Sequence, residues 1–180
     1  MKLLKFVVII FSILLLSNFG YSQSCISGII NNYTNITKFD CENSVFITDP
    51  NKFKVGDLIL IYQTKGATID YVNDTLLYGN ILSYNNSGVY EFNRIKKIIG
   101  NQVFLNNISN KTFLIDPYLQ MIRVPEYVDI RICSPGIRSD VWDGTKGGVL
   151  ALSVSGKLIF ENDIDVSGNG FRGGNRSVSE

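Results

Sequence analysis

The sequence predicts an all-β protein in which a small β-barrel-like or meander module is followed by the first rungs of a parallel β-solenoid. Three features of the composition support this fold class. Alanine, the best helix former, occurs only at Ala67 and Ala151. Ile, Val, Tyr, Phe and Thr, which favour strands, are abundant. Asn and Gly recur between the short apolar runs, where they favour turns.

Residues 1–22 are expected to be a signal peptide. Two lysines precede an apolar run over residues 6–16, and small residues follow it. The run is too short to span a bilayer, and the small residues suit cleavage before Gln23. Cleavage after Ser24 and an uncleaved anchor helix are the alternatives. We therefore expect export to the extracellular space or the cell surface, with the periplasm as the alternative, and no transmembrane segment after cleavage.

The charge of the mature chain is close to neutral. Removal of residues 1–22 deletes two lysines and no acids, so that 17 basic and 16 acidic residues become 15 and 16. This balance argues against nucleic acid as a partner and leaves no polybasic patch for an anionic membrane. Subtracting 22 from 180 leaves 158 residues, which suffice for one domain with a core or for two small modules.

Three cysteines, Cys25, Cys41 and Cys133, allow at most one internal disulfide because their number is odd. We expect a bond between Cys25 and Cys41, which would tie down the polar N-terminal segment 23–42. A bond between Cys41 and Cys133, or three free thiols, are the alternatives. Spacing alone does not choose among them.

Residues 43–133 are expected to form the small β-barrel-like module. Apolar runs alternate here with turn signals such as Asp49-Pro50-Asn51, and Gly100-Asn101 predicts a tight hairpin. Residues 66–73 are expected to leave the sheet. The expected strands span residues 45–47, 58–62, 76–83 as a return to the sheet, 89–99, 103–105, 119–124 and 127–133.

The run over residues 89–99 alternates along its whole length. Tyr90, Phe92 and Arg94 are expected on one face, with Glu91 and Asn93 on the other. A meander of this kind suggests a closed or half-closed barrel, since closure removes exposed edges.

Residues 134–147 are expected to be a loop, and residues 148–180 the start of a β-solenoid that is truncated. Apolar residues alternate in short stretches separated by turns at Gly156 and at Asn162-Asp163. Short strands separated by two-residue turns are typical of parallel solenoid rungs. An ordinary antiparallel meander is the alternative, because two rungs are too few to show a repeat period.

Several sequence blocks carry a resemblance to a known family. They are similar, in the same order, to the N-terminal region of large secreted or cell-surface proteins of Bacteroidetes. Several of those proteins resemble adhesins, and many end in a gliding-motility or type IX secretion sorting domain. The resemblance implies surface or extracellular residence and transfers no functional residue. The blocks are VGDLILIYQTKGA (55–67), YEFN (90–93), IRVPEY (122–127), WDGTKGG (142–148) and IDVSGNGFRGG (164–174).

The family pattern continues beyond the last block into a long glycine-rich region and further domains. The present sequence ends at Glu180, six residues after that block. We therefore expect the chain to be a fragment or a truncated relative.

The absence of histidine excludes several catalytic chemistries. No Ser-His-Asp or Cys-His nucleophile system and no histidine-ligated zinc or iron site can form. The cysteines lack metal-site spacing, and the glycines over residues 168–174 lack the lysine and the following helix of a phosphate-binding loop. We expect neither a cofactor nor enzymatic activity.

Trp142, Asp163 and Asp165 remain as candidate ligand residues. Trp142, the single tryptophan, would either stack on a sugar ring or pack over a domain junction. Asp163 and Asp165 would point to one face of a strand, where they could hold Ca²⁺ or act on a sugar. Asp140 and Asp143 form a second carboxylate pair. For both pairs the alternative is that aspartates beside Asn and Gly only form turns.

Two functions of different class follow. The first is a non-catalytic exported surface module of an adhesin-like protein, whose partners would be cell-surface polysaccharide or other surface proteins. The alternative is the leading module of a secreted polysaccharide-degrading enzyme, whose catalytic residues later solenoid rungs would supply.

Overall fold

The computed structural model describes residues 24–40, 43–72, 76–115 and 119–172, which form an all-β structure, as predicted. Within these ranges no helix is long and apolar enough to cross a membrane. The predicted signal peptide, residues 1–22, lies outside them. The elements are β1 (Ser24–Ile29), β2 (Tyr33–Asp40), β3 (Ser44–Ile47), the short 3-10 helix η1 (Pro50–Lys52), β4 (Leu58–Gln63), β5 (Thr68–Ile69), β6 (Ile81–Ser83), β7 (Tyr90–Ile99), β8 (Gln102–Leu105), β9 (Leu119–Val124), β10 (Glu126–Tyr127), β11 (Ile130–Arg138), β12 (Ser153–Val154) and β13 (Leu158–Phe160).

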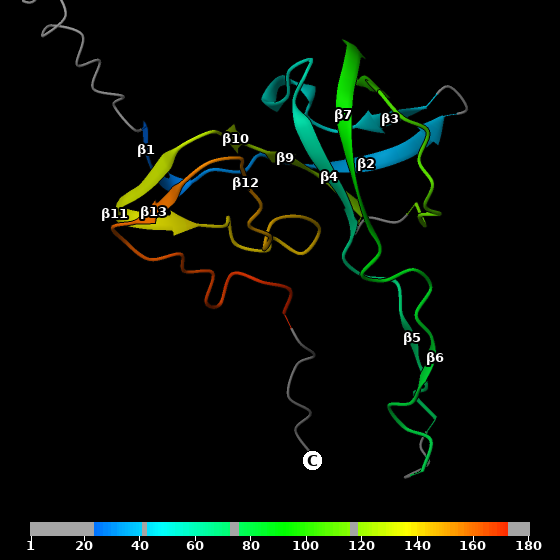
Figure 1. Ribbon diagram of the computed structural model, residues 1–180. Coiled ribbons are helices and arrows are strands. Elements are labelled where there is room, and N and C mark those ends of the chain that lie inside the picture. The colour runs from blue at the N-terminus through cyan, green and yellow to red at the C-terminus, as the bar shows by residue number, and fades with distance from the viewer. Residues whose placement is uncertain (1–23, 41–42, 73–75, 116–118, 173–180) are drawn as a thin grey trace, which may run out of the picture.

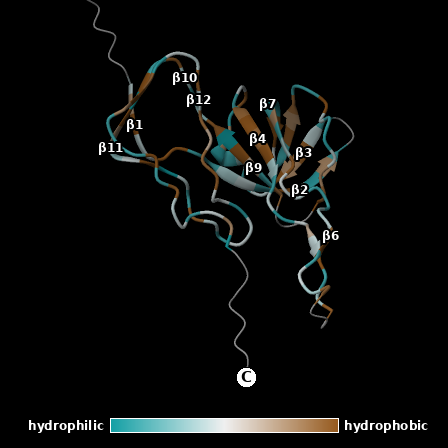
Figure 2. Cartoon of the chain, turned by 60° about the horizontal axis from the view of Figure 1, so that its bottom comes forward, coloured by the Kyte–Doolittle hydropathy of each residue, from teal (hydrophilic) through white to brown (hydrophobic). Residues whose placement is uncertain are grey.

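Six antiparallel strands close into a barrel in the order β2-β3-β8-β7-β4-β9 (Figure 1). Pairing of Tyr33 with Ile122 joins β2 to β9 and completes the ring. The two-residue Gly100-Asn101 hairpin joins β7 to β8, as predicted. The strands are largely hydrophobic, whereas most connecting loops are not (Figure 2). The buried interior cluster comprises Ile36, Val45, Ile47, Phe53, Ile59, Ile61, Ile95, Val103, Leu105, Leu119 and Met121.

Beside the barrel, short strands pair in parallel in two small sheets, β1-β11-β13 and β10-β12 (Figure 1). Their register has a nearly constant offset along the chain. Ile130 pairs with Leu158, which is 28 residues later. The pairs Glu126–Ser153 and Ile137–Ile164 are each 27 residues apart. Successive turns of the chain therefore stack on one another with almost equal lengths.

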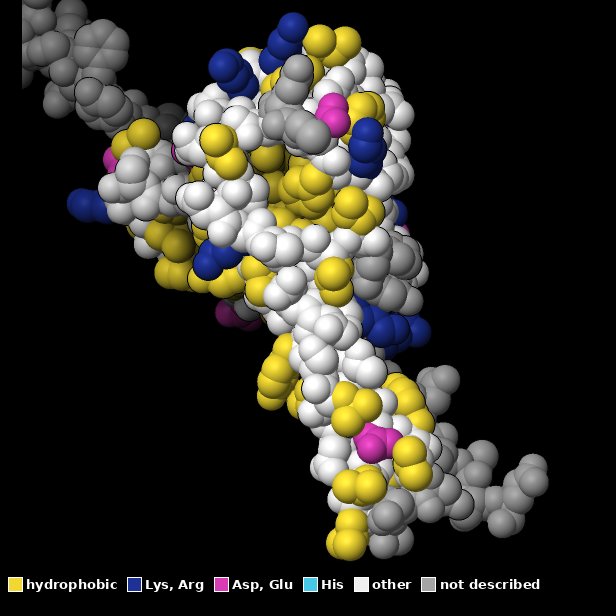
Figure 3. Space-filling model, turned by 90° about the vertical axis from the view of Figure 1, so that its right-hand side faces the viewer, with side chains coloured by type: hydrophobic (Ala, Val, Ile, Leu, Met, Phe, Trp, Pro, Cys, Tyr) yellow, Lys and Arg dark blue, Asp and Glu magenta, His cyan; other side chains and the backbone are white. Residues whose placement is uncertain are grey.

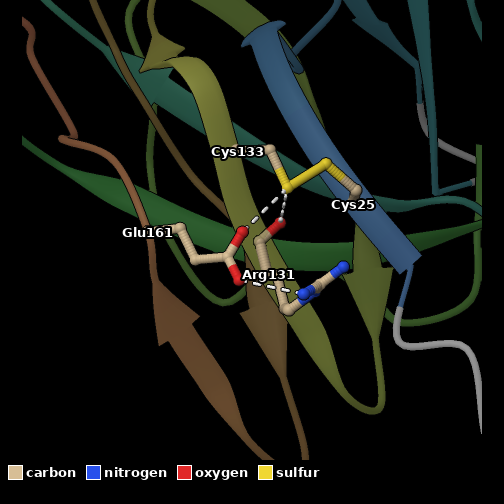
Figure 4. Close-up of a disulfide and its surroundings, with 4 residues drawn as sticks. All are labelled: Cys25, Arg131, Cys133 and Glu161. Carbon is tan, nitrogen blue, oxygen red and sulfur yellow. Dashed lines mark hydrogen bonds and ion pairs between the residues drawn. A yellow bond between two sulfur atoms is a disulfide. The ribbon is translucent and has the colours of Figure 1, made fainter.

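The first strand of this stack has a different offset. In β1, Ser24 pairs with Ile130, 106 residues later, so the whole barrel lies between β1 and its partner β11. A disulfide joins Cys25 to Cys133 across this pair, with their Cα atoms 5.9 Å apart (Figure 4). The predicted Cys25–Cys41 bond is wrong, because β1 runs beside β11 and not beside the segment that holds Cys41. Cys41 itself lies outside the described residues.

The predicted module boundaries also need correction. Strand β2 falls in the predicted polar segment 23–42 but belongs to the barrel, which spans Tyr33 to Val124 and not residues 43–133. Its Thr34 is buried because the hydroxyl shares a hydrogen bond with that of Thr48 (3.0 Å). Strand β11 belongs to the parallel sheet and continues to Arg138, into the predicted loop 134–147.

Residues 76–83 do not return to the barrel as predicted. Strand β6 pairs only with β5, and residues 67–88 form an arm that projects from the barrel (Figure 1). Buried Gln63 closes the base of the arm by donating a hydrogen bond to the carbonyl oxygen of Asn85 (2.9 Å). The side chain of Asn85 in turn donates to the hydroxyl of Thr68 (2.8 Å). These local bonds satisfy the polar groups that a barrel strand would otherwise have to pair.

A close approach between successive turns of the stack requires glycine at position 136. Gly136 has a φ of +88°. A Cβ atom there would collide with the carbonyl oxygen of Asp163. Ile137 donates its backbone N–H to that same oxygen (3.1 Å), so the next turn of the chain rests directly on β11.

We expect the Cys25→Ser/Cys133→Ser double variant to lose about 2 to 4 kcal/mol of unfolding free energy, because the bond closes a very long loop. Urea titration of the oxidised parent and of the variant measures this. The matched control is Cys41→Ser, which should leave the midpoint unchanged. Equal stability of the double variant and the parent, or an equal loss in Cys41→Ser, would contradict the observed pairing.

Candidate functional site

An apolar strip crosses the outer face of the barrel where β4, β7 and β9 run side by side. In one row of cross-strand neighbours, Phe92 pairs with Leu60 and Leu60 with Ile122. In the adjacent row, Tyr90 pairs with Tyr62. Directly paired side chains on one face of a sheet touch each other. The two rows therefore form a continuous apolar surface on the outside of the barrel.

Part of this strip is covered and part is open. Val149 and Ala151, in the segment before β12, pack against the cluster that contains Leu60 and buried Ile122. On the β7 side, Tyr90 and Phe92 remain 58% and 52% exposed, with their rings edge to face at 6.1 Å. A groove of about 530 Å³ lies between. It is lined by Leu60, Tyr62, Tyr90, Phe92, Val124, Val149, Leu150, Ala151 and Leu152, none of which is charged.

Two buried amide side chains of the barrel fix the segment that forms the second wall of the groove. Gln120 donates to the carbonyl oxygen of Gly147 (3.2 Å) and accepts from its N–H (2.9 Å). Asn31 does the same at Ala151, donating to the carbonyl oxygen (2.6 Å) and accepting from the N–H (3.1 Å). Paired in this way, the backbone of an irregular segment can be buried without loss of hydrogen bonds.

Between these two amides, Tyr33 holds the same segment. Its hydroxyl donates to the carbonyl oxygen of Val149 (2.5 Å) and accepts from the N–H of Asp140 (3.4 Å). Burial raises the pKa of Tyr33 to about 12. The phenol therefore stays protonated and keeps its hydrogen bond to Val149 over the whole neutral range.

An ion pair borders the apolar strip. Arg94 is the next outward-facing residue of β7 after Phe92, and its guanidinium donates two hydrogen bonds to Glu126, both 2.7 Å. These bonds lower the pKa of Glu126 and raise that of Arg94. Both charges are satisfied by each other, so the nearest charged groups leave the groove electrically neutral.

Trp142, expected as a ligand residue, is not accessible to one. It is only 5% exposed. Its ring packs edge to face on Phe171 with the centroids 5.6 Å apart, and its backbone N–H donates to the carbonyl oxygen of Asn169 (2.8 Å). The prediction that Trp142 could stack on a sugar is therefore wrong, and the alternative, packing between chain segments, is what the structure contains.

Asp163 and Asp165 border one shallow hollow of about 410 Å³, together with Arg138. Both residues are exposed. The carboxylate of Asp165 accepts the backbone N–H of Ser167 (2.8 Å), and hydrogen bonding from Ser167 lowers its pKa. A lowered pKa keeps Asp165 ionised, which is unsuitable for a general acid at neutral pH.

Asp143 acts as a turn former. Its burial would raise the pKa, but hydrogen bonds from Lys146 and Thr145 outweigh this effect and hold the pKa of Asp143 well below its usual range. Asp140 accepts the N–H of Val141 (2.9 Å). In the part of the chain that the structure describes, no group of three His, Cys, Asp or Glu residues could hold a metal ion.

Sequence reasoning did not identify the aromatic residues of the groove. The alternation over 89–99 correctly assigns Tyr90 and Phe92 to one face but does not say that this face is outward. A signal was present, since Arg94 shares the face and a buried arginine would need a partner inside the barrel. Asn93 points inward and satisfies its amide by donating to the carbonyl oxygen of Asn107 (3.1 Å).

Comparison with known proteins gives little. No protein-family model matches the sequence, and no curated protein matches it. Among solved structures, the chain is similar to the Gp54 tailspike of Acinetobacter baumannii bacteriophage AP22, whose structure is in complex with A. baumannii capsular saccharide. The TM-score is 0.39 at 14% identity, and the match covers 75% of this chain and 21% of the tailspike chain. A likeness of this size carries no inference about activity.

Stability should fall as pH rises from 10 to 12. An unfolded tyrosine loses its proton near pH 10, whereas Tyr33 in the folded chain keeps it until about pH 12. The unfolded state then binds fewer protons, and the free energy of unfolding should drop by about 2 to 3 kcal/mol over this window. Urea titrations from neutral pH to pH 12 measure the slope.

Tyr33→Phe is the matched variant. It should be less stable at neutral pH, because the Val149 carbonyl loses its donor, but its stability should fall less steeply above pH 10. Burial also raises the pKa of Tyr127, so part of the slope will remain. An unchanged slope in Tyr33→Phe would refute the assignment.

Proposed function

We propose that the chain is a non-catalytic module of an exported, adhesin-like surface protein, and that it binds polysaccharide in the groove beside β7. The observation that carries the proposal is the uncharged groove whose accessible wall is made of Tyr90 and Phe92. Aromatic rings pack against the apolar faces of pyranose rings, and tyrosine hydroxyls can bond to sugar hydroxyls. A concave, mostly apolar site with few polar groups is typical of ligand sites.

The lack of charged lining residues favours a neutral polysaccharide. An acidic polymer would need lysine or arginine in the groove to offset the desolvation of its carboxylates. A surface protein is the alternative partner, in which case the same rings would anchor apolar side chains.

Export is part of the proposal. The N-terminal charge and hydropathy pattern supports it, as does the Cys25–Cys133 disulfide, since such bonds persist in oxidising compartments. The resemblance to surface proteins of Bacteroidetes is consistent with the same destination.

The parallel sheets are proposed to be the first rungs of a β-solenoid. The offset of 27 or 28 residues between paired strands supports this interpretation, because solenoid rungs have nearly constant length. The barrel would then be an insertion between the first rung, β1, and the second. Such a module would present its groove at the base of a longer stalk.

Alanine at position 90 or 92 should weaken saccharide binding. Each ring contributes about 0.5 to 1.5 kcal/mol of stacking, so Tyr90→Ala and Phe92→Ala should each reduce affinity roughly 2- to 12-fold. Affinity electrophoresis in gels containing neutral glucans, mannans, xylans or galactans identifies the polymer. Calorimetry with oligosaccharides of that polymer then gives the affinities.

The matched control is Phe160→Ala, which removes an equally exposed phenylalanine from β13. It should bind like the parent, and all three variants should keep the parent melting temperature. The proposal fails if none of the polymers retards the parent, or if Phe160→Ala weakens binding as much as Phe92→Ala does.

A leading module of a polysaccharide-degrading enzyme remains the second candidate. The observation that favours it is the hollow in which Asp163 and Asp165 lie together with Arg138. The ionised state of Asp165 suits a base or nucleophile, and a partner acid would have to come from elsewhere.

Release of reducing ends from the same set of polymers tests this candidate. We expect no release above a buffer blank, because no protonated carboxyl faces Asp165 in the hollow. Turnover by the parent that is lost in both Asp163→Asn and Asp165→Asn would overturn the non-catalytic proposal and establish the enzyme.

A further inference from the structure

The arm, residues 67–88, extends away from the rest of the chain as a narrow two-stranded ribbon (Figures 1 and 3). Its order depends on bonds within itself and at its base. Asp70 and Asn80 exchange backbone contacts, with the N–H of Asp70 donating to the carbonyl oxygen of Asn80 (2.8 Å). Tyr71 and Tyr78 meet edge to face at 6.5 Å. An isolated two-stranded hairpin is at best marginally stable in water, so a ribbon of this kind benefits from a partner.

The arm is apolar on both faces. Ile81 and Leu82 are neighbours in β6 and therefore point to opposite faces, yet they are 51% and 63% exposed. Figure 3 shows hydrophobic side chains along the projecting ribbon. Tyr71, Leu76, Tyr78 and Tyr84 are also mostly exposed. No core cluster of the described residues includes any of these side chains.

The exposed apolar area is large enough for a stable interface. Aromatic and large aliphatic side chains of this size, more than half exposed, together offer on the order of 700 to 900 Å². The largest apolar patch of an ordinary monomer is about 300 to 600 Å². One side of a standard protein interface buries about 800 Å².

The edges of the arm decide what kind of partner fits. β5 and β6 pair only with each other, so each has an outer edge without a strand beside it. Hydrocarbon cannot satisfy the backbone N–H and C=O groups of such edges, which argues against insertion into a bilayer. Another β-ribbon can pair with them and cover a face at the same time.

The charge of the arm narrows the choice to a ribbon of the same kind. Residues 67–88 contain two charged residues, Asp70 and Asp74, and no lysine or arginine. A strongly charged partner therefore has little to bind. The arm of a second copy offers equally apolar faces, open edges and a matching area.

We infer that the arm is a self-association surface, through which two copies of the chain join arm to arm. Symmetric pairing of identical surfaces is the commonest route to a homo-oligomer. Antiparallel pairing of the two ribbons would keep their aspartates at opposite ends. Association rests on apolar contact, so added salt should not weaken it.

Light scattering and sedimentation velocity of the oxidised full chain, from low to high micromolar concentration, test the inference. The parent should show a concentration-dependent mass above that of one chain, undiminished by salt. The Ile81→Asp/Leu82→Asp variant should associate at least roughly tenfold more weakly, because it removes two apolar contacts on opposite faces. Circular dichroism should show an intact fold, since neither residue lies in a core.

Val55→Asp and Val128→Asp are matched controls, because they change side chains of similar exposure outside the arm. Both should associate like the parent. The inference is overturned if the parent is monomeric at every concentration, or if the arm variant associates as strongly as the controls. A monomeric parent that binds neutral phosphatidylcholine vesicles, with binding lost in the arm variant, would assign the arm to lipid instead.

Discussion

The parallel pairing of β1 with β11 is the contact on which the rest of the chain depends. It joins segments 106 residues apart, encloses the barrel between them and is fixed by the Cys25–Cys133 disulfide. β11 then serves as the template for the following turn of the chain, since it also pairs with β13. Without β1 on one side, the central strand of this small sheet would have an open edge, and its buried isoleucines would lose half of their cover.

The second requirement is the attachment of the irregular segment 147–151 to the barrel wall. Gln120, Tyr33 and Asn31 each bond to its backbone, at intervals of two residues along the segment. These side chains make the barrel and the parallel sheets one unit. They also determine how much of the outer face of the barrel is covered, and hence that the rings of β7 remain available for a ligand.

Alternation and turn chemistry predict the all-β class and most barrel strands, because inward residues such as Ile59 and Ile61 alternate with less buried neighbours. Strand β2 escapes this reasoning, since Thr34 appears polar and becomes compatible with burial only through Thr48, whose position depends on the tertiary fold. The disulfide escapes it for the same reason, because the partner of Cys25 is determined by a pairing across the entire barrel. The groove lies between segments whose proximity depends on Asn31, Tyr33 and Gln120.

The position of the barrel within the chain also constrains the order of folding. Until the barrel forms, pairing of β1 with β11 requires closure of a loop of about a hundred residues. Once β2 has paired with β9, only the few residues from Ile29 to Asn32 and from Arg123 to Ile130 separate the two strands. Loop-closure entropy falls by about 2 kcal/mol for a tenfold shorter loop. The barrel thus acts as the nucleus that brings the two cysteines together, so oxidation follows folding and does not guide it.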